Sequence, residues 1–90
     1  MSKKIEEDYL ISHEDLMDTD LSAVDLRVYL VTRLKVRSYE AVGKQFAPDG
    51  VEYAATLGIH PRMLQKAFEK LEKKGYILRE YKNRKRIIHI

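Results

Sequence analysis

Apolar residues recur at helical spacing in the second half of the chain, between positions 61 and 74. Pro61 suits the first turn of such a helix, because backbone N–H groups there make no hydrogen bond within the helix and the proline lacks one. His60 stands at or near the N-cap. Gly75 is placed to end the helix. Positions i, i+3, i+4 and i+7 of one buried face are occupied by Leu64, Ala67, Phe68 and Leu71. The pattern predicts an amphipathic helix over residues 61–74.

A shorter helix is predicted directly before it, over residues 50–57. Asp49 has the position of the N-cap, and Glu52 follows three residues later as its capping-box partner. Gly58 is the residue expected in the left-handed conformation past the helix end, and Ile59 then enters the core. The apolar positions predict that the helix buries Val51, Ala54, Ala55 and Leu57. Together with residues 61–74, this segment predicts two helices joined by a tight turn.

A further helix is predicted to begin after Ser22 and to end between Val36 and Tyr39. Ser22 is a suitable cap, and Asp25, three residues on, suits the positive end of the helix dipole. The period of 3.6 residues turns three apolar side chains inward: Tyr29, Leu30 and Leu34. In the segment that follows, residues 44–47 are predicted as a short edge strand stopped by Pro48.

The two ends of the chain differ in character. After Gly75, two β-prone runs at 76–81 and 86–90 flank the polar residues 82–85, which predicts a hairpin. Asn83 tolerates the left-handed conformation that a hairpin turn needs. Residues 1–20 are expected to form an extension docked on the core, with residues 9–11 extended and a brief helix at 13–17.

Length and composition limit the classes of protein. The 90 residues are enough for one domain, and 44% apolar with 34% charged residues is typical of a soluble globular domain. No apolar run approaches the roughly 18–20 residues that a membrane span requires, so we expect no membrane partner. The chain has no cysteine, which excludes disulfides and thiolate metal sites and favours a cytoplasmic location.

Charge is distributed unevenly along the chain. Residues 1–25 carry two lysines against eight acids, a net −6, and residues 26–60 carry a net +2. Residues 61–90 carry ten bases against three acids, a net +7, so the total of +3 understates the asymmetry. Positive charge gathered in one structural unit indicates a polyanionic partner.

Two segments carry a family resemblance. Residues 51–59, with paired alanines and a Gly-Ile turn, are followed by residues 63–77, which end in Leu-Glu-Lys-Lys-Gly-Tyr-Ile. In their order the predicted elements resemble the winged helix-turn-helix DNA-binding family. The resemblance implies an α+β fold over residues 21–90, with three core helices, a two-stranded wing and the short third strand. The front of the chain, from residues 9–11 through 21–30, is similar to the winged-helix domains of plasmid and phage replication initiators and mobile-element accessory proteins.

The resemblance implies which side chains contact DNA. Helix 61–74 would lie in the major groove, where Arg62 can pair with guanine and Gln65 with adenine. Lys66 and Lys70 would bind phosphate, and His60 would lie at the tip of the helix. The wing 76–90 would bind phosphates or contact the minor groove through five residues: Lys82, Asn83, Arg84, Lys85 and Arg86.

Other chemistry has little support in the sequence. His13, His60 and His89 are scattered and show no metal-ligand spacing, so we expect no metal, no cofactor, no small-molecule substrate and no enzyme activity. The favoured function is sequence-specific binding of double-stranded DNA by an accessory or initiator-type protein of a plasmid or phage, in replication, partition or conjugative transfer. A small transcriptional repressor and a winged-helix protein-interaction module remain alternatives. Because a single module binds weakly, a homodimer or tandem binding on repeated sites is expected.

Overall fold

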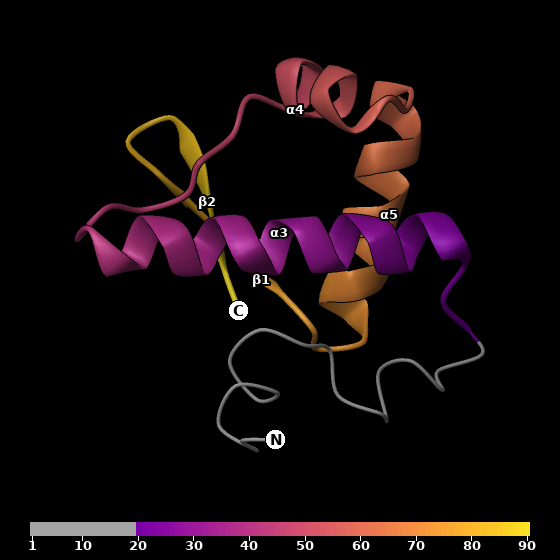
Figure 1. Ribbon diagram of the computed structural model, residues 1–90, viewed down its shortest axis with the longest axis horizontal. Helices are drawn as coiled ribbons and strands as arrows, with labels where there is room; N and C mark the ends of the chain where they lie inside the picture. Colours follow the sequence, from indigo (N-terminus) through magenta and orange to yellow (C-terminus); the bar gives the residue numbers. More distant parts are fainter. Residues whose placement is uncertain (1–19) are drawn as a thin grey trace, which may run out of the picture.

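The computed structural model describes residues 20–90, which form three helices followed by an antiparallel hairpin (Figure 1). The elements are α3 (Ala23–Ala41), α4 (Gly50–Leu57), α5 (Pro61–Lys73), β1 (Leu78–Lys82) and β2 (Lys85–His89). This is the predicted α+β layout, of winged-helix type. The predictions of an extended segment at 9–11, a brief helix at 13–17 and an extension over 1–20 concern residues outside the described ones, apart from Asp20.

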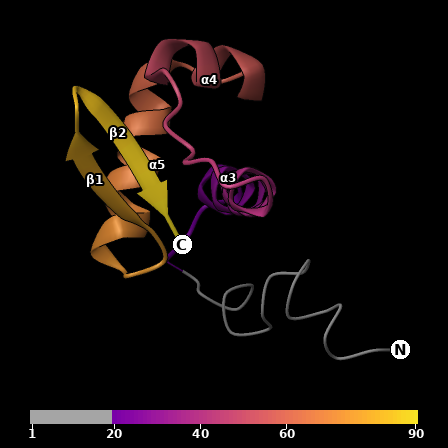
Figure 2. The ribbon, with the colours of Figure 1, turned by 90° about the vertical axis from the view of Figure 1, so that its left-hand side faces the viewer.

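The elements are arranged on two sides of a shared core. α3 lies on one side of the molecule, while α5 and the hairpin lie together on the other (Figure 2). α4 closes one end, and the hairpin turn lies at that same end in both views (Figures 1 and 2). The predicted stripe of α5 is buried as expected and packs in one core with residues of α3, α4 and β2, including Val28, Val36, Tyr53 and Ile88. None of the described helices is long and apolar enough to cross a bilayer.

The predicted helix caps are confirmed. The Ser22 hydroxyl accepts from the Asp25 N–H at 3.1 Å, and the Asp25 carboxylate accepts from the Ser22 N–H at 2.9 Å, which completes a capping box. Asp49 caps α4 by accepting from two backbone N–H groups, but the Glu52 side chain does not complete the predicted capping box. Gly58 takes the left-handed conformation at φ 72°, and His60 caps α5 by accepting from the Arg62 N–H. The three N-caps, Ser22, Asp49 and His60, satisfy donors that the first turn of a helix leaves without partners.

The predicted inward face of α3 is wrong in part. The helix runs on to Ala41, and its buried residues are Asp25, Val28, Tyr29, Thr32 and Val36. Leu34, expected inside, is 42% exposed, whereas Thr32 is fully buried. The Thr32 hydroxyl lies 2.8 Å from the Tyr53 hydroxyl, so a polar residue is accommodated in the core by a partner from α4. Tyr29 is buried as predicted and Leu30 is half-buried, so the apolar pattern is right at Tyr29 and wrong at Leu34.

The buried side of α4 also differs from the prediction. Val51 is 66% exposed and Ala55 is exposed, while Tyr53, Ala54 and Leu57 are buried. Tyr53 takes the inner position because its ring stacks on Phe68 with centroids 6.2 Å apart and meets the Phe46 ring edge-on at 5.4 Å. These ring pairs join α4 to α5 and to the segment before α4.

Residues 44–47 do not form the predicted third strand. One backbone hydrogen bond, from the Ile88 N–H to the Phe46 carbonyl at 2.9 Å, joins this segment to β2. Phe46 is buried, and its ring packs in the core. The segment is therefore held by side-chain packing and not by the hydrogen bonds of a strand ladder. Residues 44–47 nevertheless lie against the hairpin, since Phe46 and Ile88 are bonded although 42 positions (88 − 46) separate them in the sequence.

The hairpin is tighter than predicted. Its strands pair from Leu78 with His89 to Lys82 with Lys85, which leaves Asn83 and Arg84 as a two-residue turn. Both have positive φ, 52° at Asn83 and 63° at Arg84, the geometry of a type I′ turn. Directly paired residues share a face, so one face carries Arg79, Tyr81, Arg86 and Ile88, and the other carries Leu78, Glu80, Lys82, Lys85, Ile87 and His89.

Candidate nucleic-acid interface

The outward face of α5 is basic. Four exposed side chains lie opposite the buried stripe at i, i+4, i+7 and i+11: Arg62, Lys66, Glu69 and Lys73. Arg62, Lys66 and Lys73 make no ion pair with any other residue of 20–90. Three cations without acidic partners along one helix face can approach phosphates at no cost in broken ion pairs.

Gln65 and Glu69 are coupled on the wing side of that face. The Gln65 amide donates to a carboxylate oxygen of Glu69 at 3.3 Å, and both side chains are exposed. This bond uses one of the two amide hydrogens and leaves the other hydrogen and the carbonyl oxygen for an adenine edge. Gln65 is thus held by Glu69, which places a negative charge among the cations.

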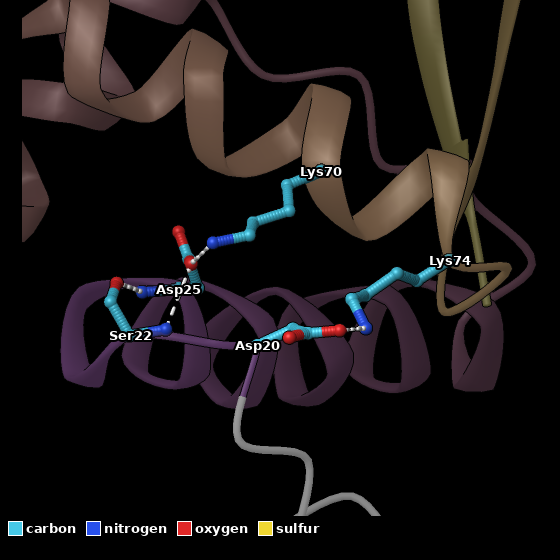
Figure 3. A network of polar contacts seen from close by, with 5 residues as sticks. All are labelled: Asp20, Ser22, Asp25, Lys70 and Lys74. Carbon is cyan, nitrogen blue, oxygen red and sulfur yellow. Dashed lines mark hydrogen bonds and ion pairs between the residues drawn. The ribbon is translucent and has the colours of Figure 1, made fainter.

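The α3 flank of α5 is engaged within the fold (Figure 3). The Lys70 ammonium lies 3.2 Å from the Asp25 carboxylate, and the Lys74 ammonium lies 3.0 Å from that of Asp20. Burial would raise the pKa of Asp25, but the Ser22 backbone N–H, the Lys70 ammonium and the Ser22 side chain together hold the pKa below its usual value. Lys70, expected at a phosphate, therefore lies to the side of the outward face and binds Asp25.

An ion pair joins the other flank of α5 to the hairpin. Arg79 of β1 binds the Glu72 carboxylate through its backbone N–H at 3.0 Å and through its guanidinium at 3.1 and 3.4 Å. The guanidinium carbon also lies 5.8 Å from the centre of the Phe68 ring. The Arg79 N–H and guanidinium hold the pKa of Glu72 below its usual value. The ion pair between Glu72 of α5 and Arg79 of β1 thereby fixes the wing against the helix.

A groove runs between α5 and the wing. It is a hollow of about 300 Å³ to which Gln65 and Glu69 contribute from the helix and Tyr81 and Arg86 from the hairpin. Gln65 and Arg86 also line an adjoining pocket of about 340 Å³ with an apolar floor. Two predicted DNA contacts, Gln65 and Arg86, are therefore brought to one surface. Tyr81, 70% exposed, belongs to the same surface and was not among the predicted residues.

The wing turn presents the other predicted residues. Lys82, Asn83, Arg84 and Lys85 are all exposed, and none of the three cations makes an ion pair within residues 20–90. The turn lies at the same end of the molecule as α4 and the start of α5 (Figures 1 and 2). Lys82 and Lys85, however, project on the wing face away from Arg86, where they line a hollow together with Lys44.

The predicted residues are thus divided among three places. Arg62 and Lys66 lie on the outward face of α5, with the exposed cap His60 at its start. Gln65 and Arg86 lie in the groove, and Lys82 to Lys85 form the wing turn. Tyr81 and Arg79 were not predicted, although alternation along β1 would place them on one face. Lys44 was not predicted either, since no local signal indicates it.

Residues 20–90 contain no group of three or more His, Cys, Asp or Glu side chains that could hold a metal ion. Comparison with known proteins returns no matching family model, no matching curated protein and no matching solved structure.

Proposed function

We propose that this protein binds double-stranded DNA, with α5 in the major groove and the hairpin turn at the adjoining phosphates or minor groove. The observation that most supports DNA binding is the placement of cations that make no ion pair within residues 20–90. Arg62 and Lys66 on the outward face of α5 and Arg84 at the wing turn belong to elements that lie on the side of the molecule away from α3 (Figure 2). Electrostatic attraction to phosphate supplies most of the non-specific affinity of such a surface.

Sequence preference would come from the first half of α5. Arg62 is suited to bidentate pairing with guanine, and Gln65, held by Glu69, is suited to adenine. Each good bidentate pair discriminates against a wrong base by about 1–3 kcal/mol. Lys66 and the wing cations position the protein without selecting a sequence.

The process served by this binding follows from the resemblance to plasmid and phage initiator and accessory domains. We place the protein at a plasmid or phage site in replication, partition or conjugative transfer, within the cytoplasm. Since a single module buries only about 600–1,000 Å² on DNA, two copies on repeated half-sites would raise the occupancy. A repressor role would use the same surface.

A salt titration of binding to random duplex is the first test. With about four to six phosphates neutralised, log affinity should fall against log salt with a slope of about −4 to −5. Binding that is absent, or insensitive to salt, would reject DNA as the partner and favour a protein-interaction module. Arg37→Ala, on the exposed surface of α3, is the matched control and should leave affinity and slope unchanged.

Selection of bound sequences from a random pool then separates readout from positioning. Arg62→Ala should change the selected motif, while Arg84→Ala should weaken binding to all sequences alike. If Arg84→Ala changes the motif and Arg62→Ala does not, the wing determines specificity and our assignment of the helix is wrong.

A further inference from the structure

A second basic surface lies on the wing face that points away from α5. Lys44 and Gln45, from the segment between α3 and α4, line a hollow of about 440 Å³ together with Lys82, Asn83 and Lys85 of the hairpin. We name this surface the three-lysine hollow. Its parts are some 38 residues apart in sequence and are held together by the Ile88 to Phe46 backbone hydrogen bond.

The lysine charges around this hollow are not neutralised by ion pairs within residues 20–90. Lys44, Lys82 and Lys85 are exposed, and none makes an ion pair with another residue of 20–90. Glu80 shares the wing face with the two hairpin lysines, but its carboxylate lies 3.3 Å from the His89 ring nitrogen. The side-chain amides of Gln45 and Asn83 add uncharged donors beside the lysines.

The hairpin register creates a specific cost. Lys82 and Lys85 are directly paired across the strands, next to the turn. Like charges at directly opposite positions destabilise an antiparallel pair, since their Cβ atoms are only about 4.5–5.5 Å apart. An anion placed between the two ammonium groups and Lys44 would remove this repulsion. The arrangement therefore favours a bound anion over the empty surface.

We infer that the three-lysine hollow binds a backbone phosphate of the same DNA duplex that α5 and the wing turn engage. This inference rests on the proposed function and adds Lys44 and Gln45 to its interface. A hairpin turn at a minor groove has a DNA strand on each of its two sides. Arg86 faces one of these sides and the three-lysine hollow faces the other, so both strands are held.

Lys44→Gln tests the inference by duplex binding at several salt concentrations. Loss of one phosphate contact should weaken binding about five- to ten-fold near 0.1 M salt and make the log–log slope shallower by about 0.9, for selected and random duplexes alike. Lys35→Gln, an exposed lysine on α3 without an ion pair within residues 20–90, is the matched control and should behave as the wild type.

Lys82→Gln supplies a second, independent readout. It should weaken duplex binding to a similar degree, yet raise the thermal midpoint of the free protein by about 1–5 °C, because the like-charge pair is removed. Opposite effects on stability and affinity are not expected from a lysine with a merely structural role. Wild-type affinity in both Lys44→Gln and Lys82→Gln would overturn the inference.

The two proposals fail in different ways. If the wild-type protein shows no salt-dependent duplex binding, the proposed function fails and this inference falls with it. If wild type and Arg84→Ala behave as proposed while Lys44→Gln and Lys82→Gln both bind like Lys35→Gln, the three-lysine hollow binds no phosphate and the function stands.

Discussion

Glu72 in the last turn of α5 and Arg79 at the start of β1 are joined by three hydrogen bonds, one to the Arg79 backbone and two to its guanidinium. Only six residues separate them, and the chain reverses direction between them through Gly75, whose φ is 84°. The backbone bond fixes where β1 begins relative to the helix, and the guanidinium bonds limit rotation of the wing about that point. This ion pair thus helps to set the angle between wing and helix, together with the packing of Ile88 in the core.

Removing the carboxylate should loosen the wing. We expect Glu72→Gln to lower the free energy of unfolding by about 0.5–1.5 kcal/mol, a value reduced by the partial exposure of the pair. Urea denaturation measures it, with Glu40→Gln on the exposed surface of α3 as the control. Faster hydrogen exchange of the β1 backbone amides should accompany the loss of stability. A variant with wild-type stability and exchange would show that core packing alone sets the wing angle.

Acid should weaken the contact between α3 and α5. The pKa of Asp25 is lowered in the folded state, so its contribution to stability is present above the unfolded value of 3.8 and is lost as pH falls through the lower folded pKa. Asp25→Asn should cost about 1 kcal/mol at neutral pH, since the pair with Lys70 is lost, and nothing at strongly acidic pH. Unfolding free energies measured between neutral and acidic pH should converge, and parallel profiles would contradict the prediction.

The buried hydroxyl pair predicts a non-additive result. Thr32→Val or Tyr53→Phe alone leaves one hydroxyl without its partner in the core and should cost about 1–3 kcal/mol. The double variant removes both hydroxyls and should cost less than the sum of the two single changes. Chemical denaturation of the four proteins gives the coupling energy. Strict additivity would mean that the two hydroxyls do not depend on each other.

The wing turn predicts a conflict between stability and binding. Arg84 has φ 63°, where a residue with a Cβ is disfavoured by about 1–2 kcal/mol, and glycine is the usual residue at this turn position. After the greater flexibility of glycine in the unfolded chain is subtracted, Arg84→Gly should stabilise the protein by roughly 0.5–1 kcal/mol. The same change should weaken duplex binding, as measured by fluorescence anisotropy. An unchanged affinity would show that Arg84 does not reach DNA.

The sequence predicts those parts of the fold in which local signals and burial agree. The caps Ser22, Asp49 and His60 and the stripe of α5 were all predictable, because each depends on residues within one turn of helix. The inner face of α3 was not, since Thr32 is buried by virtue of a partner on α4. Likewise, the one backbone bond at Phe46 depends on β2, and no pattern within residues 44–47 indicates it.

The residues of the candidate interface divide in the same way, into those that local signals predict and those that depend on other elements. The exposed positions of α5 and the basic turn could be predicted from periodicity and charge. The pairing of Lys70 with Asp25, the ion pair of Arg79 and the position of Lys44 beside the wing could not, because each joins segments from different elements.

Lys70 and Lys74 lie on the flank of α5 that faces α3, apart from the outward positions 62, 66, 69 and 73. The lysines that pair with the α3 side of the fold and the residues on the outward face are therefore separate sets on one helix. Under the proposed function, libraries randomised at 62, 65, 66 and 69 should keep the fold intact while altering the DNA motif that is bound.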